Sequence, residues 1–414
     1  MIVWKKYRLK DICSYIGSGT TPKSSNSKYY DNGIYNWVNT GDLNNGIVSN
    51  SKQQITDSAL KDFPTLRFYP KGTIIEAMYG ATIGKVGMLD MNATVNQACC
   101  AMIVDRNKAI PNFVLYYLLY YKPQLLKESF GGTQPNVNQF KVSNIAISIP
   151  SREEQQRIVT YLDTKLSEID HQVSLLTSKR DAYLRLKKSI INHAVTHGLD
   201  PNVKMKDSGI EWIGEVPEHW EVKRMKDICD YISRGSTPDY VDEDYQKVMN
   251  QGTFSKGWID ESNIRYTKVG KSGAHIKKGD LLMASTGGGV LGKILYFDSI
   301  DENYYADSHV TIMRNSKGIN SMKFLFYHFS LRFDEINATM TKGSTNQTEL
   351  QRYELLSHNV AIPPLPEQRA IATYLDDKCA KIDTIVSNLG KQISRYADLK
   401  RSLIDEVITG KRAV

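Results

Sequence analysis

The sequence predicts an α+β protein in which two pseudo-repeated α/β domains are joined by two long helices. We expect the helices to form an antiparallel coiled coil, which gives the molecule pseudo-two-fold symmetry. Residues 153–170 and 366–383 are identical at 10 of 18 positions, and both begin stretches in which apolar residues recur every three or four positions. The remaining sequence is rich in short apolar strings broken by glycine, which is typical of strands and turns.

The repeat extends well beyond those two segments. Downstream, residues 183–196 match residues 396–409 at the same offset of 213 positions. Upstream the offset varies, but YIGSGTTPK still resembles YISRGSTPD, and VNTGDLNNG resembles MNQGTFSKG. The chain is therefore two copies of one unit, a globular part of roughly 150 residues and a long segment of about 45. The predicted parts are a first globular domain at 1–150, a central helix at 151–197, a connector at 198–218, a second globular domain at 219–363 and a C-terminal helix at 364–414.

Each long segment has the features of a helix. Pro150 and Pro366 stand at the starts, and Gly198 and Gly410 follow the ends. At 1.5 Å per residue, about 45 residues make a rod of about 65 Å, whose apolar stripe needs a covering surface. The other copy is the nearest candidate, and the alternative is that each helix packs on its own globular part. The residues that we expect to pair the helices are Leu162, Leu166, Ile169, Val173, Leu176, Leu375, Ile382, Val386, Leu389 and Ile393.

The globular parts are predicted to combine short strands with one or two helices each. Strings such as GTIIEAM and DLLMAS have the length and composition of buried strands. Residues 111–127 and 321–336 are long enough, and apolar enough, to form helices. Each unit is therefore expected to be α+β.

Composition narrows the class of protein. A chain of 414 residues is too long for one ordinary core, and 41% hydrophobic with 24% charged residues is typical of a soluble globular protein. There is no run of 18 apolar residues, no N-terminal secretory signal and no C-x-x-C pair among the five cysteines. We expect a cytoplasmic protein with free thiols and no membrane segment. The net charge of +8 is compatible with a polyanionic partner.

The familiar catalytic signatures are incomplete. Residues 287–293 have the G-x4-G-K spacing of a phosphate loop, but Ile294 replaces the metal-binding Ser or Thr, so a glycine turn between two strands is expected instead. His193 and His197 lack the glutamate and the third ligand of an H-E-x-x-H zinc site. No methyltransferase motif, nuclease motif or catalytic triad is evident. We interpret the chain as a binding protein with no catalytic residue and no metal site of its own.

The repeated polar turns are the candidate ligand contacts. In each copy a G-x-T-P turn stands beside a basic residue, and hydroxyls, backbone N–H groups and a cation suit phosphate oxygens. Each turn alone is better explained by ordinary turn chemistry, but together they favour ligand binding because the two copies share framework residues while their loop residues differ. The candidate phosphate contacts are Thr20, Thr21, Lys23, Lys85, Arg234, Ser236, Thr237 and Lys293.

Loops rich in amides and other polar side chains accompany these turns in both copies. Side-chain amides are suited to bidentate hydrogen bonds with the edges of DNA bases. The candidate base-reading residues are Asn39, Thr40, Asp42, Asn96, Gln97, Gln134, Asn136, Asn250, Gln251, Ser308, His309, Thr345, Asn346 and Gln347.

Over essentially its full length the chain resembles the specificity subunit of type I restriction-modification systems. The resemblance is carried by IPPLPEQRAIATYLDDKCAKID (362–383), by its central copy SIPSREEQQRIVTYLDTKLSEID (148–170) and by the connector SGIEWIGEVPEHWEVKRMKDI (208–228). The P-x-x-E-Q helix start is close to diagnostic when it occurs twice at this spacing. The central copy departs from it, because it has Ser151-Arg152-Glu153 where the second has Pro364-Leu365-Pro366.

The resemblance implies two target recognition domains, each reading one half of an asymmetric, bipartite sequence in double-stranded DNA. The helices would set the gap between the half-sites, and the pairing residues given above would also dock partner subunits. The implied partners are two methyltransferase subunits and, through the complex, translocase-nuclease (restriction) subunits. S-adenosylmethionine, ATP and Mg would be bound by those partners, and this chain would hold no cofactor.

Two other functions stay open on the sequence. A free-standing bipartite DNA-binding regulator or architectural protein would use the helices only to space its domains. An enzyme with an unfamiliar site in the glycine-rich strands is the third possibility.

Overall fold

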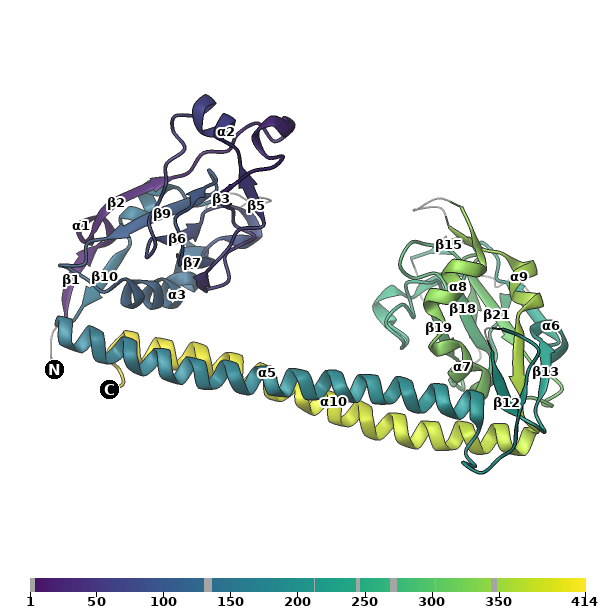
Figure 1. The fold of residues 1–414 in the computed structure, drawn as a ribbon. Helices are drawn as coiled ribbons and strands as arrows, with labels where there is room; N and C mark the ends of the chain where they lie inside the picture. Colours follow the sequence, from purple (N-terminus) through teal and green to yellow (C-terminus); the bar gives the residue numbers. More distant parts are fainter. Residues whose placement is uncertain are drawn as a thin grey trace. The chain divides into compact units, whose positions relative to one another are not determined.

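The chain folds into two compact units. The computed structural model describes residues 4–129, 136–211, 213–242, 246–268, 274–301, 303–343 and 348–414. Unit 1 consists of Met1–Thr177 with Lys391–Val414, and unit 2 consists of Ser178–Gly390 (Figure 1). Both divisions fall inside long helices, so each unit holds one globular domain, the first part of one long helix and the last part of the other.

Both long helices predicted from the apolar spacing are present. They are α5 (Arg152–His197), with 46 residues, and α10 (Leu365–Ile408), with 44 residues. All five cysteines are free thiols. Among the described residues, no helix combines the length and the apolar character needed to cross a membrane.

Unit 1 builds its globular domain from short strands and one long helix. Its elements before α5 are β1 (Lys5–Arg8), α1 (Leu9–Ile12), β2 (Cys13–Ser18), η1 (Ser27–Tyr29), β3 (Tyr35–Val38), β4 (Gly46–Val48), β5 (Gln53–Ile55), α2 (Asp57–Asp62), β6 (Ile74–Ala77), η2 (Gly80–Thr82), β7 (Val86–Leu89), β8 (Thr94–Val95), β9 (Cys99–Val104), α3 (Pro111–Lys127), α4 (Gln139–Ser143) and β10 (Ala146–Ile149).

Two sheets carry the core of unit 1. One has the strand order β2-β9-β6-β7-β4 and the other β5-β3-β8, while β1 pairs with β10. Successive side chains of a strand point to opposite faces, so neighbouring residues of β6 enter different cores. Ile74 lies in the core that contains Phe113 of α3, and Ile75 lies in a second core on the other side. The apolar string GTIIEAM is therefore buried on both faces.

Unit 2 repeats this plan with a different set of strands. Its elements before α10 are β11 (Met205–Asp207), β12 (Glu215–Pro217), β13 (Glu221–Arg224), α6 (Met225–Ile228), β14 (Tyr231–Arg234), β15 (Tyr240–Val241), β16 (Gln246–Met249), η3 (Glu261–Asn263), β17 (Arg265–Thr267), β18 (Leu281–Ala284), β19 (Ile294–Tyr296), β20 (Tyr304–Ala306), β21 (Val310–Arg314), α7 (Met322–Ser330), α8 (Phe333–Thr339), β22 (Thr341–Lys342), β23 (Glu349–Leu350), α9 (Arg352–Ser357) and β24 (Asn359–Ile362).

The sheets of unit 2 correspond to those of unit 1. Their strand orders are β14-β21-β18-β19 and β15-β17-β16-β20, and β13 pairs with β24. Leu281 shares a core with Phe324 of α7, whereas Leu282 faces the second core. The G-K segment near Lys293 lies between the paired strands β18 and β19, so the predicted glycine turn is confirmed. The connector contributes the hairpin of β11 and β12.

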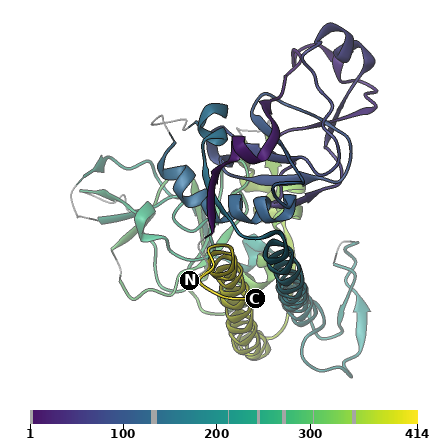
Figure 2. The same cartoon turned by 90° about the vertical axis from the view of Figure 1, so that its left-hand side faces the viewer.

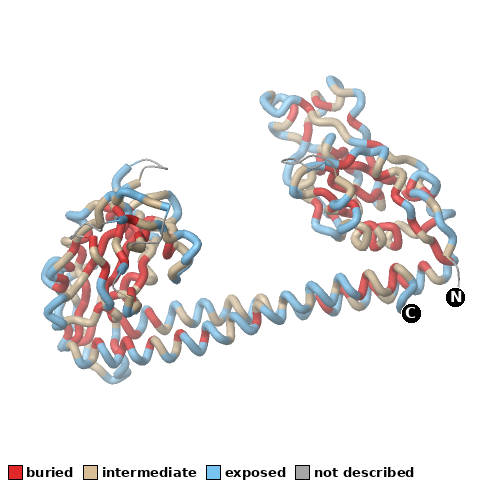
Figure 3. Tube along the Cα trace, turned by 180° about the vertical axis from the view of Figure 1, so that it is seen from behind, coloured by how far each residue is buried: buried red, intermediate tan, exposed pale blue. Residues whose placement is uncertain are grey.

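The long helices run antiparallel within each unit and pack on its globular domain. In unit 1, Leu162 of α5 shares a buried cluster with Val407 of α10 and Phe113 of α3. In unit 2, Leu375 of α10 shares one with Val195 of α5. Each helix therefore does both of the things considered above, since it packs on its own domain and pairs with its counterpart. Figure 3 shows buried residues spaced along both helices.

The remaining predicted pairing residues fall into two groups. Leu166, Ile169, Ile382 and Leu389 are buried, and Val173, Leu176, Val386 and Ile393 are half-buried.

The repeated Glu-Gln at the helix starts has a structural reason. Gln155 is 2% exposed; its side-chain oxygen accepts a hydrogen bond from the N–H of Ile110 at 2.9 Å, and its amide donates to the carbonyl five residues earlier at 3.1 Å. Gln368 is 1% exposed and makes the same two contacts, at 2.7 Å to the N–H of Ser321 and 2.9 Å to the carbonyl. Ile110 and Ser321 cap α3 and α7. Each glutamine thus fastens a long helix to the main helix of its own domain.

Glycine ends each long helix, as predicted. Gly198 has φ of 78° and Gly410 has φ of 73°, the left-handed region that favours glycine. A tryptophan lies against each: a Cβ on Gly410 would come within 3.1 Å of Trp4, and one on Gly198 within 3.4 Å of Trp220. Trp4 and Gly410 both belong to unit 1, so the two ends of the described chain meet there (Figure 2).

Candidate nucleic-acid interface

A pair of parallel strands frames the candidate site in each unit. β3 pairs with β8 in unit 1, and β16 pairs with β20 in unit 2. Because both strands of a pair run in one direction, the loops that follow them emerge side by side. These loops begin at Asn39 and Asn96 in unit 1, and at Asn250 and Asp307 in unit 2. In each unit the N–H of the second of these residues donates to the carbonyl just before the first, at 2.9 Å and 3.0 Å.

The G-x-T-P turns lie against the same edge. The N–H of Thr20 donates to the last carbonyl of β8 at 3.0 Å, and the N–H of Ser236 donates to the last carbonyl of β20 at 3.2 Å. A Cβ on Gly19 would lie 1.9 Å from the β8 carbonyl oxygen, and one on Gly235 would lie 2.1 Å from that of β20. Only glycine fits this approach. These two N–H groups are therefore used within the fold.

The threonine hydroxyls of these turns join each turn to the loop after the parallel strand. Thr21 accepts a hydrogen bond from the N–H of Gln97 at 3.3 Å, and Thr237 donates to the hydroxyl of Ser308 at 3.2 Å. Equivalent residues thus connect the same two segments in both units. The structure therefore brings together, within each unit, three loops that the sequence analysis had singled out separately.

The four predicted cations have different surroundings. Arg234 forms an ion pair with Glu349, and Lys293 donates to a backbone carbonyl in the loop after β16 at 2.7 Å. Lys23 is exposed and Lys85 is half-buried, and neither forms an ion pair with any residue that the structure describes. Arg234 and Lys293 are therefore held by the chain, whereas Lys23 extends into solvent beside the turn.

The amides of unit 1 use their oxygens to shape their own loops. The side-chain oxygen of Asn39 accepts from the N–H of Gly41 at 3.0 Å, and that of Asn96 accepts from the N–H two residues later at 2.9 Å. Asp42 accepts from the N–H groups of Asn39 and Lys52 at 3.0 and 3.2 Å. The amide nitrogens of Asn39 and Asn96 make no hydrogen bond within the described ranges, and these donors stand at the edge of the site. Thr40 is half-buried and Gln97 is exposed in the same loops.

The same residue types recur in unit 2 with more internal bonding. Asn250 accepts from the N–H of Gly252 at 2.7 Å and donates to the carbonyl of Asn263 at 3.3 Å. His309 is exposed, and its Nδ1 lies 2.7 Å from the hydroxyl of Thr286. Gln251 is half-buried beside them.

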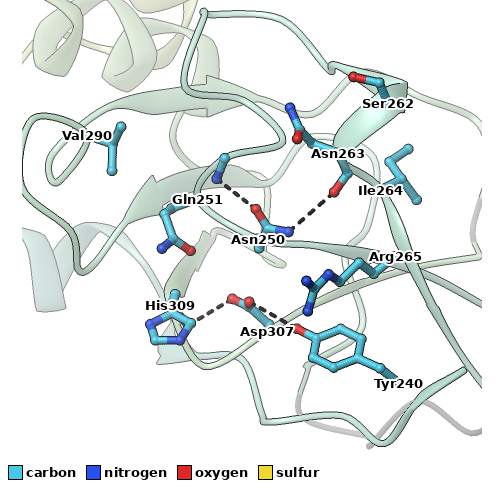
Figure 4. Close-up of a pocket in the computed structure, with 11 residues that line it drawn as sticks. Tyr240, Asn250, Gln251, Ser262, Asn263, Ile264, Arg265, Val290, Asp307 and His309 are labelled. Atoms are coloured by element: carbon cyan, nitrogen blue, oxygen red, sulfur yellow. Dashed lines mark hydrogen bonds between the residues drawn. The ribbon is translucent and has the colours of Figure 1, made fainter. Parts of the chain in front are cut away.

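A pocket of about 760 Å³ opens between these loops of unit 2 (Figure 4). The hydroxyl of Tyr240 donates to Asp307 at 3.3 Å, and the guanidinium carbon of Arg265 lies 4.8 Å from the centre of the Tyr240 ring. Asp307 is only 2% exposed, and burial raises its pKa, an effect that the His309 N–H bonded to it at 2.8 Å opposes. Burial also raises the pKa of Tyr240. The other lining residues are Asn250, Gln251, Gly252, Ser262, Asn263, Ile264, Val290 and His309.

The sequence did not single out three residues of this pocket, namely Tyr240, Arg265 and Asp307. Strand register identifies the counterparts of Arg265 and Asp307 in unit 1. Arg265 stands opposite the third residue of β16, and Gln53 stands opposite the third residue of β3. Asp307 and Asn96 each follow the second strand of the parallel pair. The frame is therefore common to both units, while the side chains on it differ.

Four predicted base-reading residues lie outside the described ranges, namely Gln134, Thr345, Asn346 and Gln347. Asn136 is exposed and forms a bridge with Tyr79. Within the part of the chain that is described, no group of three or more His, Cys, Asp or Glu side chains is placed to hold a metal ion.

The chain is similar in sequence to specificity subunits of type I restriction enzymes. The type I restriction modification DNA specificity domain matches it over residues 1–175 and again over 217–395. The type I restriction enzyme MjaVIII specificity subunit of Methanocaldococcus jannaschii is 24% identical, across 99% of this chain and 92% of that protein. The MjaIX specificity subunit of the same organism is 25% identical, across 99% and 94%.

Solved structures share the fold. A chain from a structure of the type I R-M system, described in terms of complex assembly and conformational transition, has a TM-score of 0.75 at 16% identity and covers 99% of this chain and 98% of that one. The HsdS subunit from Thermoanaerobacter tengcongensis has a TM-score of 0.51 at 16% identity, with the same coverage. The predicted fold class is confirmed. With both globular domains matched by the same domain family, this chain belongs to the type I restriction modification DNA specificity domain family.

Proposed function

We propose that this chain is the DNA-recognition subunit of a type I restriction-modification complex, in which each unit reads one half of a bipartite target in double-stranded DNA. One observation carries the proposal. Both units present the same backbone frame, but counterpart positions differ, with Asn96 and Gln53 in unit 1 against Asp307 and Arg265 in unit 2. A constant scaffold with different side chains at its edge is what reading two different half-sites requires. The target is therefore asymmetric.

Partner subunits would carry out the catalytic steps. The relatives are named specificity subunits, which supports a recognition role without catalysis for this chain. Adenine methylation would draw on S-adenosylmethionine in the methyltransferase subunits. Translocation and cleavage would draw on ATP and Mg in the restriction subunits, which join through the complex.

The long helices supply docking surfaces of the same kind in each unit. Leu186 on α5 and Leu399 on α10 are 213 positions apart and are 47% and 50% exposed. Exposed apolar side chains at counterpart positions suit a partner that binds both units in the same way. We therefore propose two methyltransferase subunits, one on each unit.

The helices also act as the spacer between the half-sites. α5 continues unbroken through the junction at residues 177 and 178, and α10 continues through 390 and 391. Inserting seven residues into each helix at these junctions lengthens it by about 10 Å, which is near three base pairs of B-DNA at about 3.4 Å each. The gap should lengthen while both half-sites stay the same. Altered half-site bases in such a variant would contradict the spacer role.

Methylome sequencing tests the recognition role directly. The chain would be expressed in a host lacking other adenine methyltransferases, with and without its methyltransferase partner. We expect methylated adenines in one asymmetric bipartite sequence only when both proteins are present. Methylation or cleavage by the chain alone would make it an enzyme, and site-specific DNA binding with no methylation in the presence of the partner would favour a free-standing regulator.

A further inference from the structure

The pocket of unit 2 holds a cation that the fold does not neutralise through a close ion pair. Arg265 is exposed on β17 and forms no ion pair within 4.0 Å in the described chain, although the charge of the Asp307 carboxylate acts on it from a longer distance. Figure 4 shows its side chain directed across the pocket toward Tyr240 and Asp307. By contrast, Arg234 of the same unit is paired with Glu349. Arg265 therefore presents its charge and its N–H donors at the mouth of a site built from loops.

The surroundings fix the orientation of this guanidinium. Its carbon lies 4.8 Å from the centre of the Tyr240 ring, and the guanidinium also interacts with the Tyr240 hydroxyl, so Tyr240 restricts the orientation of the group. Tyr240 is itself held by the hydrogen bond from its hydroxyl to the buried carboxylate of Asp307, at 3.3 Å. Asp307 is in turn fixed by the His309 N–H at 2.8 Å. Asp307 therefore positions Tyr240, and Tyr240 positions Arg265.

The geometry points to Arg265 as the residue through which unit 2 selects a guanine, with Asp307 and Tyr240 as positioning residues. A planar guanidinium presents two parallel donors that match O6 and N7 of guanine in the major groove. This inference rests on the proposed function and adds to it the base that one position selects. A preorganised side chain discriminates better because less freedom is lost on binding.

Unit 1 provides the internal contrast. The counterpart of Arg265 is Gln53, and the counterpart of Asp307 is Asn96. A glutamine presents one donor and one acceptor, which suit adenine rather than guanine. We therefore expect the guanine preference only in the half-site that unit 2 reads. The corresponding base position in the half-site of unit 1 has no arginine to read it.

A substitution borrowed from unit 1 tests the assignment. The chain with its methyltransferase partner would carry Arg265→Gln, Arg265→Lys or, as a control, Lys278→Gln, which removes an exposed cation of unit 2 that pairs with Asp298. Methylome sequencing would give the target of each complex, and titration of duplexes altered at single positions would give the affinities. We expect Arg265→Gln to reduce discrimination for guanine at one position by about 10- to 100-fold. Arg265→Lys should reduce it less, and Lys278→Gln should change no base.

Three outcomes overturn the assignment. The first is a wild-type target without a G·C pair in either half, and the second is an Arg265→Gln complex with an unchanged target. The third is a uniform loss of affinity for all duplexes with a salt dependence shallower by about one unit, which marks a phosphate contact. An unchanged half-site for unit 1 shows that the variant is folded. If the wild-type complex has no bipartite target at all, the proposed function fails rather than the role of Arg265.

The positioning residues have their own test. Tyr240→Phe keeps the ring but removes the hydrogen bond to Asp307, and Asp307→Asn introduces the residue of unit 1. Both should relax the same target position as Arg265→Gln, by a smaller factor, and leave the other positions unchanged. A merely structural role would instead weaken binding at every position of that half-site, and that outcome would remove Tyr240 and Asp307 from the assignment.

Discussion

The ammonium of Lys400 donates to both carboxylate oxygens of Asp170 at 2.8 Å. Lys187 and Asp383 make the counterpart contact in unit 2, at 2.7 Å to each oxygen. The two aspartates are 213 positions apart, as are the two lysines, so the same ion pair occurs once in each copy of the repeat. In a parallel, in-register pairing of the copies the aspartates would face each other. These charges therefore favour the antiparallel arrangement of α5 and α10 over a parallel one.

Charge reversal tests this pairing. Lys400→Glu places two carboxylates together and should lower the free energy of unfolding by about 1 kcal/mol, since the pair is largely exposed. Adding Asp170→Lys should restore most of that loss, and the effect should shrink as salt is raised. Urea denaturation measures each free energy. Lys391→Glu, on an exposed lysine of the same helix, serves as the control. A double variant no more stable than Lys400→Glu would show that the contact does not contribute.

Substitution of Gln155 or Gln368 should lower the free energy of unfolding far more than substitution of an exposed neighbour. Gln155→Ala leaves the part-buried N–H of Ile110 without its acceptor, and we expect a loss of about 1–3 kcal/mol in the free energy of unfolding. Gln156→Ala, one position along on the exposed side, should cost less than about 0.5 kcal/mol. Chemical denaturation, with hydrogen exchange at Ile110, would measure both. Equal losses for the two variants would rule out the fastening role of Gln155.

Glu76 should make the protein less stable as pH rises. It is 1% exposed in β6, and neither carboxylate oxygen finds a hydrogen-bond partner in the described chain. Burial raises its pKa from 4.5 to about 8, although the ammonium of Lys122 acts in the opposite direction. The folded state therefore holds a proton that the unfolded chain releases between these values. Stability from this group is complete below about pH 4.5 and is lost as pH rises to about 8.

The counterpart of Glu76 in unit 2 is Met283, which provides the test variant. Glu76→Met should be more stable than wild type at pH 8, and the advantage should shrink toward pH 5 by at most about 1.4 kcal/mol per pH unit. Thermal unfolding at several pH values measures this difference. Glu153→Met, at an exposed position, should show no such trend. A constant difference between Glu76→Met and wild type from pH 5 to pH 8 would contradict the raised pKa.

Leu186 and Leu399 test the proposed docking of two methyltransferase subunits. Replacing either leucine by serine should leave the melting temperature almost unchanged, because both side chains are about half exposed. Each single variant should bind one partner subunit normally and the other about 10-fold more weakly, and the double variant should weaken both. Analytical ultracentrifugation of the mixed subunits distinguishes these species. Lys391→Ser is a surface control on the same helix, and unchanged assembly of the double variant would place the docking surface elsewhere.

The repeat, the two long helices and their ends could all be predicted from the sequence. Apolar spacing, helix-start residues and the terminal glycines act over a few positions, so they are legible without the fold. The G-x-T-P turns were found in the same way, although their glycines are required for a reason that only the fold reveals. The carbonyls that approach Gly19 and Gly235 belong to β8 and β20, more than 70 positions downstream.

The contents of the candidate site depended on tertiary structure. Arg234 was predicted as a phosphate contact from its place beside a turn, but its pairing with Glu349 depends on a strand that lies far along the chain. Arg265 carried no local signal, because its position beside Tyr240 follows from how β17 pairs with β15 and β16. Local sequence thus determined the repeated scaffold and the two long helices, α5 and α10. Long-range strand pairing decided which side chains share a pocket, since that pairing alone brings residues distant in sequence within hydrogen-bond reach.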